Sequence, residues 1–212
     1  MKCPHCLEAF HEEWSRDQIN RDNQNEYFMS SCICPSCGKS IIRLGIRNSS
    51  MSQIAWNFVY PKVASRIPIP PEVDDLILIA DYNEACLVLP DSAKASAALS
   101  RRCLQHILKE KAAVTGGDLS AQIDLVIESG KLPTHLVENL DCVRSIGNFA
   151  AHPIKSKQSG EILDVEPGEA EWNLDVVEEL MDFYFVKPAH SKARKVALNS
   201  KLREAGKPEL PV

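Results

Sequence analysis

The pattern of apolar and polar positions changes character near residue 70. Before that point, short apolar runs alternate with polar residues between pairs of cysteines, which is typical of strands. Strands are predicted at residues 26–34, 39–47 and 53–61. Beyond it, apolar residues recur every three or four positions over longer stretches, which predicts amphipathic helices. The pattern therefore indicates a mainly α-helical chain with a small β-structure in its N-terminal part.

Capping residues and helix breakers locate the helices. Each predicted helix begins near an Asp, Ser or Pro and ends before Gly or Pro, as helices commonly do. Residues 161–165 read as extended, and 191–206 form a basic, helix-prone tail. The predicted helices cover residues 74–89, 91–114, 118–129, 132–152 and 167–186, the last ending before Pro188. Several helices joined by short connections predict a helical bundle.

A proline-rich stretch marks the boundary between the two parts. Residues 61–73 contain four prolines, a composition that favours an extended linker. We therefore expect four regions: a β-structure at 1–60, a linker at 61–73, a helical bundle at 74–188 and a basic helical tail at 189–212.

Charge and hydropathy limit the classes of function. The formal net charge of the 212 residues is −5, so bulk attraction to nucleic acid is not expected. The charge is uneven, because residues 161–182 carry nine acidic and no basic side chains, whereas 187–207 carry seven Lys or Arg and only Glu204. No apolar run reaches the length of a membrane helix, about 20 residues. The first residues lack the apolar segment of a signal peptide, so we expect a cytoplasmic protein with reduced cysteines and no membrane partner.

Four of the eight cysteines form two C-x2-C pairs. The pairs are Cys3 with Cys6 and Cys34 with Cys37, separated by 27 residues, and each encloses a proline suited to a tight turn. Four thiolates brought together by two such turns form a closed tetrahedral zinc site. The arrangement with its flanking strands resembles a zinc ribbon, in which structural Zn²⁺ holds a sheet too small to fold alone.

Two other residues compete for a position in this ligand set. Cys32 is two residues before Cys34, and His5 lies inside the first pair. A set of four cysteines is favoured, with either residue as an alternative ligand. Cys86, Cys103 and Cys142 are isolated in helical patterns and are assigned to packing.

A polar row crosses the fourth predicted helix. Arg144, Asn148 and His152 are spaced four residues apart, so that they share one stripe of a helix. Small residues lie between them, and His152 precedes Pro153 at the helix C-terminus, whose dipole favours imidazolium. The row is either a candidate active site or a buried polar network that fixes helix packing.

These residues carry a resemblance to a known family. The strings ASAALSRRCLQHIL, LDCVRSIGNFAAHP and EAEWNLDVVEELMDFYFV resemble the DUF4145 domain over about residues 72 to 200. That family occurs alone or with restriction enzymes and is similar to HEPN domains, many of which are metal-independent ribonucleases. The resemblance implies a HEPN-like helical bundle, preceded here by the zinc ribbon.

The chain departs from the usual HEPN signature at one position. Asn148 and His152 match an Arg-Asn-x3-His motif, but Gly147 stands where the motif has arginine, and Arg144 is one turn upstream. If Arg144 substitutes, histidine would act as the base, arginine would bind the phosphate, and asparagine would orient either group. Since one histidine does not readily act as both acid and base, the resemblance implies a homodimer formed through the bundle.

A second stretch also fits the signature. Arg101 and His106 have the motif spacing, and Arg102 with His106 is an i, i+4 pair on one helix face. The alternative is a solvated face, with Arg101 or Arg102 reaching toward the row of Arg144.

Three functions therefore stay open. The first is an endoribonuclease in phage defence or a toxin system. The second is an inactive module that binds RNA, DNA or a protein, and the third is a structural dimer that accompanies a restriction system.

Overall fold

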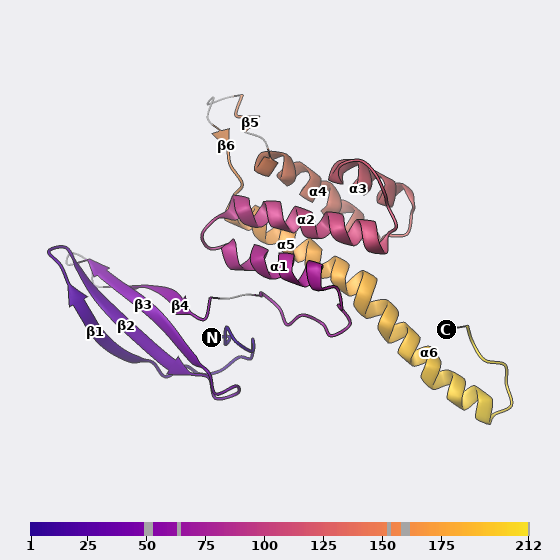
Figure 1. Cartoon of the computed structure of the whole chain (residues 1–212), viewed down its shortest axis with the longest axis horizontal. Coiled ribbons are helices and arrows are strands. Elements are labelled where there is room, and N and C mark those ends of the chain that lie inside the picture. Colours follow the sequence, from indigo (N-terminus) through magenta and orange to yellow (C-terminus); the bar gives the residue numbers. More distant parts are fainter. Residues whose placement is uncertain (49–52, 63–64, 152–153, 158–161, 212) are drawn as a thin grey trace. The chain divides into compact units, whose positions relative to one another are not determined.

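The computed structural model describes residues 1–48, 53–62, 65–151, 154–157 and 162–211; for 147–151 and Ile154 it describes the backbone alone. The chain divides into two compact units, which we call the ribbon unit (Met1–Pro68) and the helical unit (Ile69–Val212). Figure 1 shows the four-stranded sheet in the first unit, and the helices with the short strands β5 and β6 in the second. The chain is thus mainly helical, with a small antiparallel sheet near the N-terminus.

The ribbon unit is a four-stranded antiparallel sheet with strands in sequence order. Strands β2 to β4 lie where the apolar alternation predicts them. β1 was not predicted. Its seven residues are all exposed, and all except Ile19 are polar, so the strand has no apolar face that a sequence pattern could show. Its pairing with β2 defines it instead. The strands are β1 (Ser15–Arg21), β2 (Asn25–Ile33), β3 (Ser40–Asn48) and β4 (Ala55–Tyr60).

The helical unit consists of helices joined by short turns, with one small hairpin. Polar N-caps begin the first three helices: Asp75, Ser92 and Asp118 each accept backbone NH groups of the first turn. The elements are α1 (Leu76–Val88), α2 (Ala93–Lys111), α3 (Leu119–Glu128), α4 (Thr134–Ala151), β5 (Ile154–Lys155), β6 (Ile162–Leu163), α5 (Pro167–Met181), η1 (Asp182–Val186) and α6 (Lys187–Glu204).

Helix α2 is central to this unit, because it packs on α1, α3, α4 and α5. Its buried side chains Leu104, Ile107 and Leu108 follow helical spacing and are fully enclosed. α4 contributes Leu136, Leu140 and Val143, which recur at helical spacing and are buried. The unit therefore has an apolar core of its own, as a domain of this size requires.

The helix that begins at Pro167 does not end before Pro188, contrary to the prediction. It widens into a π turn at η1 and continues directly into α6, with Pro188 in the first turn of α6. The NH of Lys187 bonds to the carbonyl of Asp182, five residues back. Proline lacks an NH and clashes with the preceding turn, and a wider turn relieves both problems. One helical segment thus joins the acidic and basic stretches.

The described part of the chain contains no helix with the combined length and apolar character needed to cross a membrane.

Candidate functional site

Each cysteine pair of the ribbon unit lies in a tight turn of the same form. In the first turn, the NH of Leu7 donates to the carbonyl oxygen of Cys3 at 2.8 Å. In the second turn, the NH of Gly38 donates to the carbonyl oxygen of Cys34, also at 2.8 Å. Leu7 and Gly38 follow the second cysteine of their pairs, and both are left-handed, with φ of 61° and 69°. The two turns are therefore equivalent in hydrogen bonding and backbone conformation.

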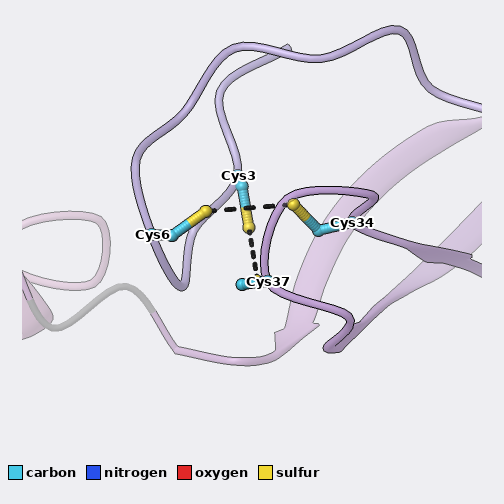
Figure 2. Close-up of side chains that lie close together, drawn as sticks. All are labelled: Cys3, Cys6, Cys34 and Cys37. Carbon is cyan, nitrogen blue, oxygen red and sulfur yellow. Dashed lines mark hydrogen bonds between the residues drawn. The ribbon is translucent and has the colours of Figure 1, made fainter.

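These turns bring four sulfurs together (Figure 2). The Sγ atoms of Cys3, Cys6, Cys34 and Cys37 all lie within 4.8 Å of one another. Two of the Sγ···Sγ distances, Cys3 to Cys37 and Cys6 to Cys34, are 3.8 Å. A tetrahedral ion with metal–sulfur bonds of about 2.3 Å has edges of about 3.8 Å between its ligands. The four cysteines can therefore hold a metal ion with little movement of their side chains.

Backbone NH groups favour the thiolate form on the second turn. Desolvation acts to raise the pKa of Cys34, but hydrogen bonds from the NH groups of Cys37 and Ser36 lower it to about 6. The NH of Glu8 acts to lower the pKa of Cys6, yet desolvation and the neighbouring thiols raise it to about 12. Since the thiolate is the form that binds metal, Cys34 is prepared for an ion before one binds.

Neither competing residue joins the cluster. Cys32 is buried in β2 beside Ile41 and is not among the four grouped sulfurs. The Nε2 atom of His5 lies 2.8 Å from the carbonyl oxygen of Ser40, so the ring ties the first turn to the start of β3. The ligand set that the structure assembles is thus the four-cysteine set predicted from the spacing.

One face of the ribbon sheet carries stacked arginine and aromatic side chains, which we call the stacked face. The guanidinium carbon of Arg43 lies 3.7 Å from the ring centroid of Trp14 and 4.3 Å from that of Trp56. The Arg16 guanidinium lies 5.4 Å from the Trp56 ring, and Phe58 lies 6.3 Å from Trp14 between ring centroids. Contacts therefore run continuously from Phe58 through Trp14, Arg43 and Trp56 to Arg16.

Strand register explains why these residues meet. Arg43 pairs with Phe58 across β3 and β4, and Gly45 pairs with Trp56. A side chain at Gly45 would meet the Trp56 ring, because a Cβ placed there comes within 2.6 Å of it. Glycine thus lets the indole lie over β3 and reach Arg43.

The two ends of this stack are open. The Phe58 side chain is 49% exposed and Arg16 is exposed, whereas Arg43 is half-buried. Burial lowers the pKa of Arg43, and the Glu12 carboxylate opposes this. Sequence reasoning did not identify this face, because the register that aligns the residues is not readable from their spacing. The signal in the sequence was the three tryptophans, two of which lie here.

Arg144 in α4 is engaged by two carboxylates. Its guanidinium donates hydrogen bonds to Asp124 of α3 and to Asp141, one turn earlier in α4. Desolvation acts to lower the pKa of Arg144, but the hydrogen bonds and charges of Asp124 and Asp141 together raise it overall. The side chain is 33% exposed, so it lies at the surface of the α3–α4 contact. A phosphate would have to compete with both carboxylates for its donors.

The other two residues of the row are less fully described. The backbone of Asn148 lies in α4, one turn beyond Arg144, and His152 lies outside the described residues. The structure therefore places the first two members on one helix.

The second motif-like stretch has structural partners. The Nε2 atom of His106 lies 2.7 Å from Asp75, the N-cap of α1, and the Arg102 Nε atom lies 2.9 Å from Asp81. The expectation from the sequence is that Arg101 or Arg102 reaches toward the row of Arg144; Arg102 pairs with Asp81 of α1 instead. Burial lowers the pKa of Arg101, and Asp118 opposes this. The contacts of His106 and Arg102 fasten α2 to α1.

The fold and the cysteine cluster define a mainly helical protein with an N-terminal β-unit built around a candidate metal site. Residues 83–204 match the model of a family described as a domain of unknown function, DUF4145, so the chain belongs to that family. The match covers most of the helical unit and leaves the ribbon unit outside. Neither a curated protein nor a solved structure matches the chain significantly.

Proposed function

We propose that this protein is a nucleic-acid-binding module whose ribbon unit binds single-stranded RNA or DNA on the stacked face. The observation that carries the proposal is the continuous stack from Phe58 to Arg16 with both ends accessible. Unpaired bases stack on aromatic rings and on guanidinium planes alike. A base placed on Phe58 or Arg16 would extend a stack that already exists in the free protein.

We propose further that the bound ion is Zn²⁺ and that its role is structural. Four thiolates in a closed tetrahedron are typical of structural zinc and leave no open position for a substrate. The ion would hold the two turns against β2 and β3. It would thereby maintain the strand register that forms the stacked face.

Electrostatics should contribute little to this binding. Arg47 on this face is bonded to Glu26, whereas Arg16 and Arg43 belong to the stack and are the arginines placed to approach phosphates of a stacked strand. Two phosphate contacts on a single strand give a slope of about −1.4 in the logarithm of affinity against the logarithm of salt concentration. A shallow slope of this kind would distinguish stacking from bulk charge attraction.

The binding test uses the complete zinc-loaded chain and fluorescein-labelled dodecamers of uridine or thymidine, followed by anisotropy. Phe58→Ala should weaken binding by about 5- to 100-fold, because one base–aromatic stack is worth about 1–3 kcal/mol. Met29→Ala is the matched control, since Met29 is 40% exposed on the opposite face of the sheet. Equal affinity for wild type and Phe58→Ala would refute the stacked face as the binding site.

A ribonuclease is the second candidate, set in phage defence, a toxin system or a restriction system. The observation that favours it is that α4 runs unbroken through Arg144 and Asn148 to Ala151, immediately before His152. On this reading the helical unit is HEPN-like, and a homodimer through the bundle supplies two histidines. Arg144 would first have to release Asp124 or Asp141.

Incubation with single-stranded and structured RNA in EDTA tests this candidate, provided that the helical unit remains folded by circular dichroism. Cleavage that yields 2′,3′-cyclic ends and is lost in His152→Ala, but kept in His135→Ala, would support the enzyme. If the wild-type protein leaves the RNA intact, the ribonuclease candidate is excluded and the nucleic-acid-binding module is the candidate that stays.

A further inference from the structure

Helix α6 is largely exposed from His190 onward, although the His190 Nε2 atom lies 3.0 Å from the Glu72 carboxylate. Every residue from His190 to Leu198 is exposed, which is more than two turns around the whole circumference. Val196 and Leu198 are 51% and 45% exposed. The C-terminal tail contacts the helix near its end, at Asn199. The side-chain amide of Asn199 donates to the carbonyl oxygen of Leu210 and accepts a hydrogen bond from the NH of Leu210. A helix this exposed gains little from tertiary packing, which normally stabilises helices.

The continuous segment of α5, η1 and α6 is strongly polarised along its length. Its first half, from Glu166 to Asp182, carries seven acidic and no basic residues; its second, from Lys187 to Arg203, carries six basic and no acidic residues. Because the two halves follow one another in one helical segment, the basic half cannot fold back onto the acidic half of the same chain. Figure 1 shows α6 continuing from α5 away from the other helices of this unit.

Two hollows lie along one side of this segment. The first has a volume of about 510 Å³ and is lined by His135 and Leu136 of α4 and by Asp175, Glu178, Glu179, Asp182 and Lys187. The second, about 330 Å³, is lined by Lys187, His190, Ser191, Arg194, Lys195 and Leu198. Lys187 lines both and lies 2.8 Å from Asp182, so an acidic hollow passes directly into a basic one.

We propose that a second copy of this chain binds along this side, antiparallel, so that α6 of each subunit lies against α5 of the other. A two-fold axis between Tyr184 and Phe185 would bring Asp175 opposite Arg194 and Asp182 opposite Lys187 of the mate. The same register sets Trp172, which is 39% exposed, opposite Ala197 and beside Leu198. Two-fold symmetry makes each contact occur twice, which is the usual form of a homodimer.

This dimer does not rest on the proposed function of the ribbon unit. It also differs from a homodimer that pairs the α4 helices, because the facing residues come from α5 and α6 and only His135 and Leu136 at the start of α4 line the first hollow. Its contacts lie mainly between opposite charges at the surface, so they should weaken as salt screens them.

Sedimentation equilibrium of the full zinc-loaded chain tests the proposal. The wild type should be a dimer, and Arg194→Glu should raise its dissociation constant by roughly 30-fold, because each of two symmetric ion pairs becomes a repulsion of about 1 kcal/mol. Lys192→Glu is the matched control: it makes the same charge change on a side of α6 that does not line the hollows. It should leave the dimer intact.

The double variant Asp175→Lys with Arg194→Glu exchanges the charges across the axis and should restore the dimer. Circular dichroism would verify that each variant keeps the helical content of the wild type. A monomeric wild type, a dimer unaffected by Arg194→Glu, or a folded double variant that stays monomeric would each overturn the proposal. RNA or DNA binding to the stacked face is measured separately, so that either proposal can fail alone.

Discussion

The ribbon unit and the helical unit differ in how much apolar surface they bury. Among the described residues, five apolar side chains are buried in the ribbon unit, of which three are cysteines, against 26 in the helical unit. The ribbon sheet leaves apolar side chains such as Ile33 and Phe58 largely exposed. With so small a core, the ribbon unit would be stabilised mainly by an ion bound to its four cysteines, as we propose, whereas the helical unit is stabilised by packing.

The difference has a functional counterpart. In the ribbon unit, aromatic side chains that a larger core would bury remain at the surface and stack with arginine. In the helical unit, the charged residues of α2 are used to fasten helices together, as in the contacts of Arg102 and His106 with α1. On the proposed function, the ribbon unit supplies the binding surface and the helical unit a scaffold.

The largest effect is expected from breaking the metal site. Cys34→Ala removes one of four ligands, and structural zinc contributes about 10–16 kcal/mol to the folding of small zinc domains. Hydrogen exchange should show loss of amide protection over β1 to β3 and unchanged protection in α2. Cys32→Ala is the control, because Cys32 is buried in the same sheet but outside the cluster. Retained metal and full protection in Cys34→Ala would show that the ribbon does not depend on the ion.

A smaller effect, confined to the other unit, is expected from Leu104→Ala. Leu104 is fully buried in the central helix, and truncation of such a leucine costs about 2–5 kcal/mol. Urea unfolding followed by far-UV circular dichroism should shift accordingly, while metal content stays the same. Leu125→Ala, at a leucine that is 48% exposed in α3, should change little. Loss of metal in Leu104→Ala would mean that the two units do not fold independently.

Gly45→Ala should sharpen the link between packing and binding in the ribbon unit. The added methyl group would lie 2.6 Å from both Ile54 and the Trp56 ring, and overpacking of this kind costs about 1–3 kcal/mol. Tryptophan fluorescence should change as Trp56 moves away from Arg43, and oligonucleotide affinity should fall. Gly168→Ala, where no atom lies within 4 Å of the new methyl group, should affect neither. An unchanged spectrum in Gly45→Ala would contradict the role given to this glycine.

The smallest effect is expected at Asp75, with a defined pH dependence. Burial acts to raise the pKa of Asp75, but hydrogen bonds from the NH of Leu78 and from His106 lower it overall. A carboxyl group whose pKa is lowered by folding stabilises the protein above its unfolded pKa of about 3.9, and this is lost as pH falls through the folded value. Asp75→Ala should therefore cost about 1–2 kcal/mol at pH 7, and the difference should narrow below pH about 4.

Thermal unfolding of wild type and Asp75→Ala across pH 2.5 to 7 measures this difference. Asp74→Ala is the matched control, since Asp74 is exposed and caps no helix. A difference between wild type and Asp75→Ala that does not change with pH would show that the carboxylate charge is not involved.

Local signals predicted much of the fold. An Asp or Ser near the helix starts, and apolar residues at helical spacing such as Leu136, Leu140 and Val143, were readable because a helix satisfies them within one segment; the structure selects Asp75 and Ser92 as the caps. β1 was missed because an exposed edge strand needs no apolar face, only a partner. The continuation of the helix through Pro188 was missed because proline, which lacks an NH and clashes with the preceding turn, normally ends a helix. Here the π turn at η1 accommodates it.

For the candidate site, the sequence by itself determined the two C-x2-C turns and favoured the four-cysteine set, because the spacing within each turn brings two sulfurs close together; the structure then left Cys32 and His5 outside the cluster. Only the tertiary structure decided which partners the long charged side chains take. Arg144 meets Asp124, His106 meets Asp75, and Arg43 lies between two indoles. A cysteine turn is a local geometry, whereas the partner of an arginine depends on strand register and helix packing, which join residues far apart in the chain.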